Sequence, residues 1–183
     1  MHKKALWWST VFLAGAAAGA ATFSLLAPRA HTSVARIAFT DPTGAIAPLS
    51  DATSTYRNST YGFSLAYPTE LTVDEFDEGE GSRTIVFRKG EENVGFQIFI
   101  TPYQAATLSQ EGLKRIAPSL AIENAKATTV GTATPALAFT SKAPGIGVSR
   151  ELWFAHDGRL FEVTTYPDRA AWLSGIFATL SFP

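Results

Sequence analysis

Residues 150–166 read RELWFAHDGRLFEVTTY, with an apolar run on each side of Asp157-Gly158. Asp-Gly is favoured where both residues of a two-residue turn need a positive φ, so the stretch predicts a β-hairpin. A two-residue loop would pair His156 with Arg159. One face of the hairpin would then be apolar and the other mixed: Leu152, Phe154, Phe161 and Val163 against Glu151, Trp153, Glu162 and Thr164. A loop longer by one residue would change this pairing.

Alternation of apolar and polar residues, the pattern of a half-buried strand, recurs upstream of the hairpin. It predicts strands at 63–67, 71–76, 84–88, 94–100, 127–130 and 136–141. Two helices are expected as well. One has the form of a capping box, with Thr107 as the cap and Gln110 three positions on, and it ends at Pro118. The other is capped by Asp168 and carries apolar residues at helical spacing.

The first 28 residues have a different character. No charged residue occurs from Ala5 to Pro28, and Lys3-Lys4 precede the run. A helix over Ala5–Leu26 would be roughly 33 Å long, enough for a hydrocarbon core of about 30 Å. Residues 1–28 therefore predict a signal-anchor that crosses the bacterial cytoplasmic membrane once. The lysines would stay in the cytoplasm and the rest of the chain would lie on the extracytoplasmic side.

Two further points concern this apolar segment. A signal peptide cleaved at the small residues Ser33-Val34-Ala35 is the alternative to an anchor, and it would leave the domain secreted. Gly15 and Gly19 form a GxxxG pattern, whose small residues let two membrane helices approach closely. The pattern predicts a homodimer through the anchor, although signal and anchor segments are often rich in Gly and Ala without pairing.

The remainder of the chain divides into a spacer and one domain. Residues 29–55 are rich in Ala, Thr, Ser and Pro, whereas residues 56–183 carry the strand and helix patterns. The net charge is −1, and no basic patch indicates nucleic acid. The chain has no cysteine, which excludes disulfides, thiol nucleophiles and thiolate metal sites.

Three motifs of the domain carry a resemblance to a known family. They are Tyr61-Gly62-Phe63-Ser64-Leu65-Ala66-Tyr67-Pro68, the strand Ala136–Phe139, and Leu152-Trp153-Phe154 leading to Leu160-Phe161-Glu162-Val163. With these motifs, in this order, the domain resembles the PsbP-like fold of PsbP and Ran-binding Mog proteins, above all its small membrane-anchored bacterial members. The resemblance implies an α+β fold, an antiparallel sheet with helices packed on its faces. It also implies a non-enzymatic binding or assembly role, and the motifs contain no catalytic or cofactor-binding signature.

Two groups of residues could hold a metal or act in catalysis, but a simpler interpretation applies to each. The acidic run consists of Asp74, Glu75, Asp77, Glu78 and Glu80. Its carboxylates could hold Ca²⁺, but the spacing is not that of an EF-hand, and a solvated hairpin turn is the simpler interpretation. His156 with Asp157 and a serine could serve nucleophilic catalysis. No G-x-S-x-G motif is present, so a surface histidine beside a turn is expected, and neither a metal site nor a catalytic residue is predicted.

Glu151, Trp153 and Glu162 form the third group, on the mixed face of the hairpin. An aromatic plate beside two carboxylates suits a sugar or a cationic ligand, which would make this face a ligand-facing surface. The alternative is that a helix covers the face and Trp153 belongs to the packing.

The sequence thus predicts a membrane-tethered, extracytoplasmic binding or assembly module without enzymatic activity or cofactor. Its partners would be the membrane and another envelope protein. The alternative is an exported hydrolase that acts on envelope polysaccharide through acidic residues, with Glu151 and Glu162 as the carboxylate pair.

Overall fold

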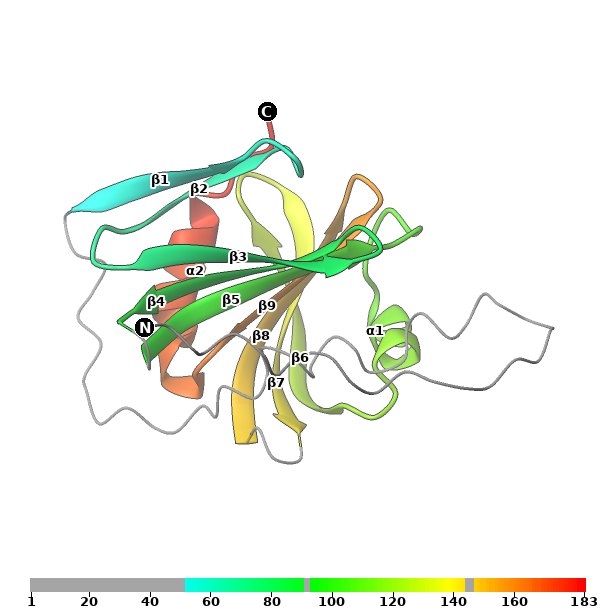
Figure 1. Ribbon diagram of the computed structural model, residues 1–183. Coiled ribbons are helices and arrows are strands. Elements are labelled where there is room, and N and C mark those ends of the chain that lie inside the picture. Colours follow the sequence, from blue (N-terminus) through cyan, green and yellow to red (C-terminus); the bar gives the residue numbers. More distant parts are fainter. Residues whose placement is uncertain (1–51, 91–92, 144–146) are drawn as a thin grey trace, which may run out of the picture.

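The computed structural model describes residues 52–90, 93–143 and 147–183 (Figure 1). The strands in chain order are β1 (Thr53–Asn58), β2 (Phe63–Pro68), β3 (Thr72–Gly79), β4 (Ser82–Lys89), β5 (Asn93–Pro102), β6 (Ala121–Val130), β7 (Thr134–Ala143), β8 (Gly147–His156) and β9 (Arg159–Thr165). The helices are α1 (Gln110–Ile116), the 3₁₀ turn η3 (Pro167–Arg169) and α2 (Ala170–Ala178). Within these residues no helix is long and apolar enough to cross a membrane. The predicted anchor, 1–28, lies outside them.

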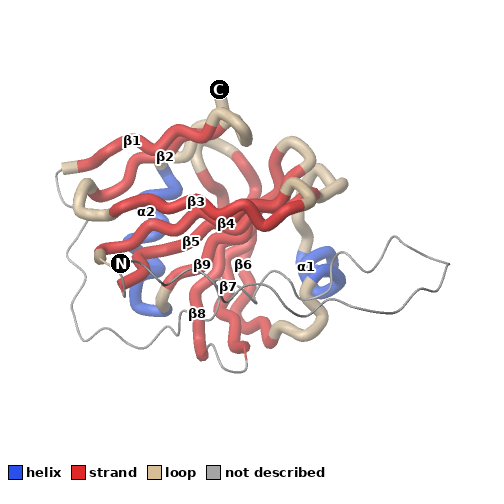
Figure 2. Tube along the Cα trace, viewed as in Figure 1, coloured by secondary structure: helices blue, strands red, loops and turns tan. Residues whose placement is uncertain are grey.

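Seven of the strands form one antiparallel sheet in the order β3-β4-β5-β9-β8-β7-β6. The sheet joins a meander of three strands to a meander of four, because β9 returns to pair with β5. β1 and β2 form a separate hairpin (Figure 2). The expected antiparallel sheet with helices on its faces is therefore observed.

The β8–β9 hairpin has the register that the sequence predicted. Asp157 and Gly158 form the turn with φ of 43° and 68°, and His156 pairs with Arg159. The same register places Phe154 opposite Phe161. Alternation from this turn fixes which side chains of the two strands share a face of the sheet.

The main core lies between one face of the sheet, α2 and the β1–β2 hairpin. Aromatic rings stack in pairs within it: Phe87 on Phe96 with ring centroids 4.2 Å apart, and Phe154 on Phe161 at 4.8 Å. α2 contributes buried apolar residues at helical spacing, namely Leu173, Ile176 and Phe177. The four rings alone remove several hundred Å² of apolar surface from water, so this face dominates the stability of the fold.

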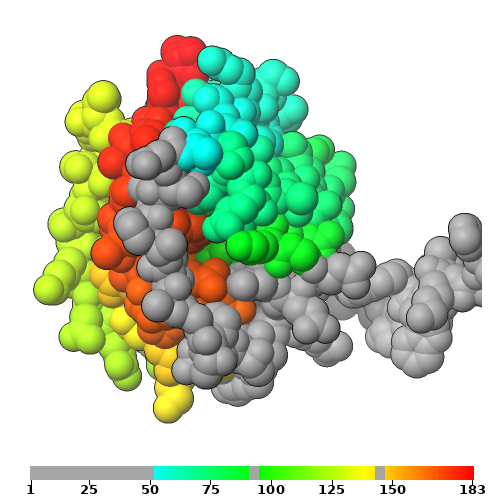
Figure 3. Space-filling model, turned by 90° about the vertical axis from the view of Figure 1, so that its left-hand side faces the viewer, coloured from blue at the N-terminus to red at the C-terminus, as the bar shows by residue number. Residues whose placement is uncertain are grey.

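The C-terminal residues attach the β1–β2 hairpin to the body of the domain. Ser64 and Ser181 exchange two backbone hydrogen bonds of 2.9 Å, and the Ala66 amide donates to the Thr179 hydroxyl at 2.8 Å. Figure 3 shows the red C-terminal residues directly against the cyan hairpin. The first and last described segments are therefore joined to each other.

A smaller core lies on the opposite face of the sheet, where α1 packs. It gathers Leu108, Leu113, Leu137, Phe139, Trp153 and Leu160, all buried. Because α1 is short, this second cluster depends on the loop segments before and after the helix as well as on the helix itself.

Two predicted helix caps and one domain boundary are corrected. Ser109, not Thr107, caps α1: its backbone is extended, with φ −95° and ψ 166°, and its hydroxyl accepts from the Gly112 amide at 3.0 Å. Asp168 caps no helix, because η3 fills the turn before α2 and α2 has no side-chain cap. β1 begins at Thr53, so the last residues of the predicted spacer 29–55 belong to a strand.

Candidate functional site

Glu151, Trp153 and Glu162 do share one face of the β8–β9 hairpin, as the sequence predicted. Trp153 is paired with Glu162, and Glu151 is paired with Thr164. All three predicted residues are buried, with exposed fractions of 4% for Glu151, 1% for Trp153 and 6% for Glu162. The register is therefore confirmed, but these side chains do not form an accessible surface.

The carboxylate of Glu151 is the centre of a buried hydrogen-bond network. Ser141 and Ser149 lie on β7 and β8, and their hydroxyls donate to its Oε1 at 2.8 and 2.7 Å. The Trp153 indole and the Thr164 hydroxyl donate to its Oε2 at 3.0 and 2.8 Å. Because both oxygens have donors, the hydrogen-bonding capacity of this buried group is satisfied, and Glu151 is held in place by its neighbours.

Glu162 lies in a different environment. Burial, and to a smaller extent the nearby charge of Glu151, raise the pKa of its carboxyl to about 8. Glu162 is therefore protonated at neutral pH.

Packing against the α1 side of the domain explains why this face is closed. Trp153 packs edge-to-face on Phe139 with ring centroids 5.3 Å apart, in the cluster to which Leu113 of α1 and Leu108 also belong. The covered face, which the sequence left as the alternative, is what the structure shows. A ligand-facing surface of Glu151, Trp153 and Glu162 is wrong for this conformation, because apolar side chains occupy the space above the indole.

The acidic run of β3 and the following turn takes part in local pairing. Arg88 contacts Asp74 at 2.6 Å, Arg83 contacts Glu75 at 2.9 Å, and the Thr84 hydroxyl donates to Glu78 at 2.8 Å. Within the described part of the chain, no three His, Cys, Asp or Glu side chains are placed to hold a metal ion together. These carboxylates stabilise the pairing of β3 with β4.

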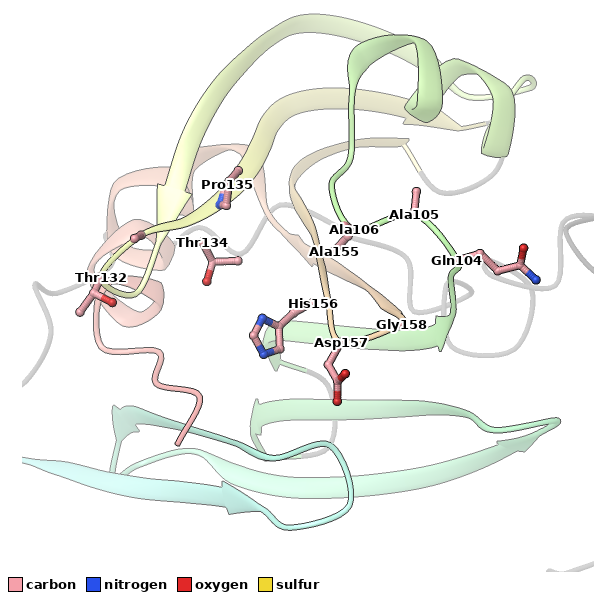
Figure 4. Close-up of a pocket in the computed structure, with 11 residues that line it drawn as sticks. Gln104, Ala105, Ala106, Thr132, Thr134, Pro135, Ala155, His156, Asp157 and Gly158 are labelled. Carbon is pink, nitrogen blue, oxygen red and sulfur yellow. The ribbon is translucent and has the colours of Figure 1, made fainter.

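The accessible polar side chains gather instead in an open depression of about 480 Å³ where three turns meet (Figure 4). One turn follows β5 and supplies Gln104 and its neighbours, the second joins β6 to β7, and the third is the β8–β9 turn with His156. The turns are far apart in the sequence, and sequence reasoning missed the depression. The small residues in its turns are a weak sequence signal for such a depression.

His156 is fixed by stacking. Its ring lies on Phe182 with centroids 3.6 Å apart and an interplanar angle of 19°. In the described part of the chain, no hydrogen bond joins its imidazole to Asp157 or to a hydroxyl group. The hydrogen-bonded relay of a hydrolase triad is therefore not formed at this residue. His156 flanks the turn, as predicted, and it is partly buried.

Comparisons with known proteins give a structural likeness. No family model matches the chain, and no curated protein does. Among solved structures, the chain is similar to cyanobacterial PsbP (CyanoP) from Synechocystis sp. PCC 6803, with 17% sequence identity and a TM-score of 0.48. The match covers 78% of this chain and 99% of that chain. Cyanobacterial PsbP belongs to the fold family that the sequence motifs of this domain resemble.

Proposed function

We propose that the protein is a membrane-tethered, extracytoplasmic binding or assembly module without catalytic activity of its own. The proposal rests on a contrast between the buried carboxyl groups of Glu151 and Glu162 and the open depression. The carboxyl groups suited to acid–base chemistry are buried at 4% and 6% exposure. The accessible polar side chains line an open depression in which no nucleophile is hydrogen-bonded to a base among the described residues. Such a surface can bind, but it lacks the arrangement that chemistry requires.

Tethering rests on the sequence of residues 1–28. The run without charge from Ala5 to Pro28 follows Lys3-Lys4, which the positive-inside bias keeps in the cytoplasm. The module would then project from the bacterial cytoplasmic membrane and hold another envelope component, in the first instance a protein, near the membrane.

The experiment is fractionation of cells that produce the full chain, compared with a variant that lacks residues 1–28. The full chain should stay in the membrane pellet after an alkaline wash, and protease added to spheroplasts should digest the domain. The truncated chain should remain in the cytoplasm. A full chain that is recovered from the cytoplasm, or that is protected in intact spheroplasts, would contradict the proposal.

Partner binding is tested in the same cells by site-specific photo-crosslinking from the depression. A photoreactive residue at Gln104, which is exposed, should give a discrete cross-linked product, and the same residue at Lys126, which is exposed on β6, should not. Equal products from both positions would show random collision rather than binding.

One observation favours the second candidate, an exported hydrolase of envelope polysaccharide. Glu162 is protonated, and Glu151, which accepts from four donors, lies diagonally across the strand pair from it. A protonated carboxyl group near a second carboxyl group is the pairing that a general acid and its partner carboxylate require. Glu151→Gln and Glu162→Gln decide between the candidates. Loss of a glycan-hydrolysing activity in both variants, at a pH where urea unfolding shows each variant to be folded, would favour the hydrolase. Unchanged activity would exclude these residues from it.

A further inference from the structure

Five polar side chains line the depression, and the fold does not use their hydrogen-bonding groups. They are Gln104, Thr132, Thr134, His156 and Asp157. None of these side chains makes a hydrogen bond within the described part of the chain, in contrast to the hydroxyl groups that surround Glu151. Their donors and acceptors are therefore available to a ligand. Figure 4 places the His156 ring in the middle of the lining residues and shows the Gln104 amide pointing away toward the rim.

The remaining lining is apolar and small. Ala105, Ala106, Ala155 and Pro135 leave the space of about 480 Å³ open, a volume within the usual range for small-molecule sites. A surface that combines apolar patches with separate hydroxyl, amide and imidazole groups matches a ligand of the same mixed character. Such a ligand has hydroxyl groups on its edges and C–H groups on its faces.

The charge of the lining narrows the class of ligand. Among the residues that the structure describes, no Lys or Arg side chain lines the depression, and the one carboxylate there, Asp157, would repel an anion. A single exposed carboxylate is too few for Ca²⁺, which takes six or more oxygen ligands. The depression is therefore suited to a neutral ligand that offers several hydroxyl or amide groups.

Backbone contacts hold the three turns in place. The Tyr103 amide donates to the Gly158 carbonyl at 2.8 Å, which joins the turn after β5 to the β8–β9 turn. The Gly131 amide donates to the Phe177 carbonyl at 2.8 Å and fixes the β6–β7 turn on the end of α2. Because these turns are held before a ligand arrives, binding would require little ordering of the protein.

We propose that this depression binds a short neutral saccharide, as a segment of an envelope glycan would present. The assignment rests on the proposed function, because only a module outside the cytoplasm is exposed to envelope glycans. The Thr134 hydroxyl and the His156 imidazole make the central hydrogen bonds to the sugar hydroxyls. The alanines and Pro135 contact its C–H face.

The test is binding of chitotetraose to the full chain in a detergent without a sugar headgroup, measured by saturation-transfer NMR and calorimetry. His156→Phe keeps a ring on Phe182 but removes both nitrogens, and Thr134→Val removes a hydroxyl at constant shape. Each should weaken binding by about 3- to 10-fold, the effect of one or two lost hydrogen bonds. Thr128→Val, on the exposed face of β6, is the matched control and should change nothing.

Three results would overturn the assignment. These are no saturation transfer at millimolar chitotetraose, unchanged affinity in His156→Phe and Thr134→Val, and an equal loss in Thr128→Val. Thr132→Ala lies on an exposed turn on which the fold does not depend, so a loss of affinity in this variant supports the site even if another variant misfolds.

A second arm uses trigalacturonate as an anionic saccharide. The wild type should bind it more weakly than chitotetraose, and Asp157→Asn, which tolerates the positive φ of the turn, should reduce that difference. Equal binding of both probes by the wild type would overturn the neutral class. If the protein is found in the membrane and cross-links from Gln104 but binds no saccharide, only the saccharide assignment is wrong. If the full chain is recovered from the cytoplasm, the proposed function itself is wrong.

Discussion

Glu162 on β9 lies diagonally across the strand pair from Glu151 on β8, so that two carboxyl groups share one buried face of the sheet. Glu151 accepts hydrogen bonds from four side chains, and its charge contributes to the raised pKa of Glu162. The Glu162 carboxyl group therefore stays protonated in the folded state at neutral pH. This gives the domain a pH-dependent stability that can be measured.

Glu162→Gln should stabilise the domain at alkaline pH. The pKa of Glu162 is about 8 in the folded state against an ordinary 4.5, so the folded state binds a proton that the unfolded chain releases. Wild-type stability should fall as pH rises from about 4.5 to about 8, and Gln, which cannot ionise, should not show this loss. At pH 9 the variant should be more stable by on the order of 3 kcal/mol. Urea denaturation at pH 4.5, 7 and 9 measures the difference.

The control for this experiment is Glu123→Gln on exposed β6. Its stability should follow that of the wild type at each pH. A Glu162→Gln variant whose advantage is the same at pH 4.5 and pH 9 would show that the carboxyl is not protonated in the folded state.

Glu151→Gln should destabilise the domain at neutral pH by about 2–4 kcal/mol. The amide keeps one acceptor oxygen but turns an NH₂ group toward side chains that are themselves donors. The substitution also removes the charge that raises the pKa of Glu162, so the pH at which stability declines should move downward. Urea unfolding across the same pH range checks both effects. An unchanged midpoint of the pH profile would contradict the coupling between the two carboxyl groups.

Gly131→Ala should cost more than Gly62→Ala, although both residues have a positive φ. A Cβ at Gly131 would meet the backbone carbonyl oxygen of Leu180 at a separation no side chain tolerates, whereas a Cβ at Gly62 meets nothing within 4 Å. We expect a loss of about 3 kcal/mol or more for Gly131→Ala and about 1 kcal/mol for Gly62→Ala. Thermal unfolding of the two variants compares them directly, and similar losses would show that the end of α2 moves away freely.

Gly15→Ile with Gly19→Ile should reduce pairing of the predicted anchor, because branched side chains hold two membrane helices apart. Ala17→Ile, on the other side of that helix, is the matched control. Cross-linking of the full chain in membranes measures dimers in each variant. Dimers that persist in the double variant, or that are lost equally in Ala17→Ile, would exclude the glycine pattern as the cause.

Local sequence signals predicted the hairpin well because its turn and its alternation agree. Asp157-Gly158 fixed the loop length, and the loop length fixed the pairing of His156 with Arg159 and of every residue beyond it. The cap of α1 was misplaced by two residues, since Thr107 and Ser109 both offer a hydroxyl and only the backbone conformation selects Ser109.

Burial of the mixed face and formation of the depression could not be predicted in the same way. Alternation shows that Glu151 and Trp153 share a face, but whether that face is covered depends on where α1 packs. The depression depends on turns around residues 104, 132 and 156, whose approach is a property of the completed sheet. Neither outcome is encoded in the spacing of residues along one segment.

The exchange of hydrogen bonds between Ser64 and Ser181 has a mechanical consequence. The chain enters the domain through β1, and β1 pairs only with β2 within the described residues. If residues 1–28 anchor the chain as proposed, a pull from that end would load the β1–β2 hairpin and its hydrogen bonds to Ser181 before any strand of the seven-stranded sheet. The hairpin would therefore give way before the larger sheet. Because Phe182, on which His156 stacks, directly follows Ser181, the loss of these hydrogen bonds would also reach the depression.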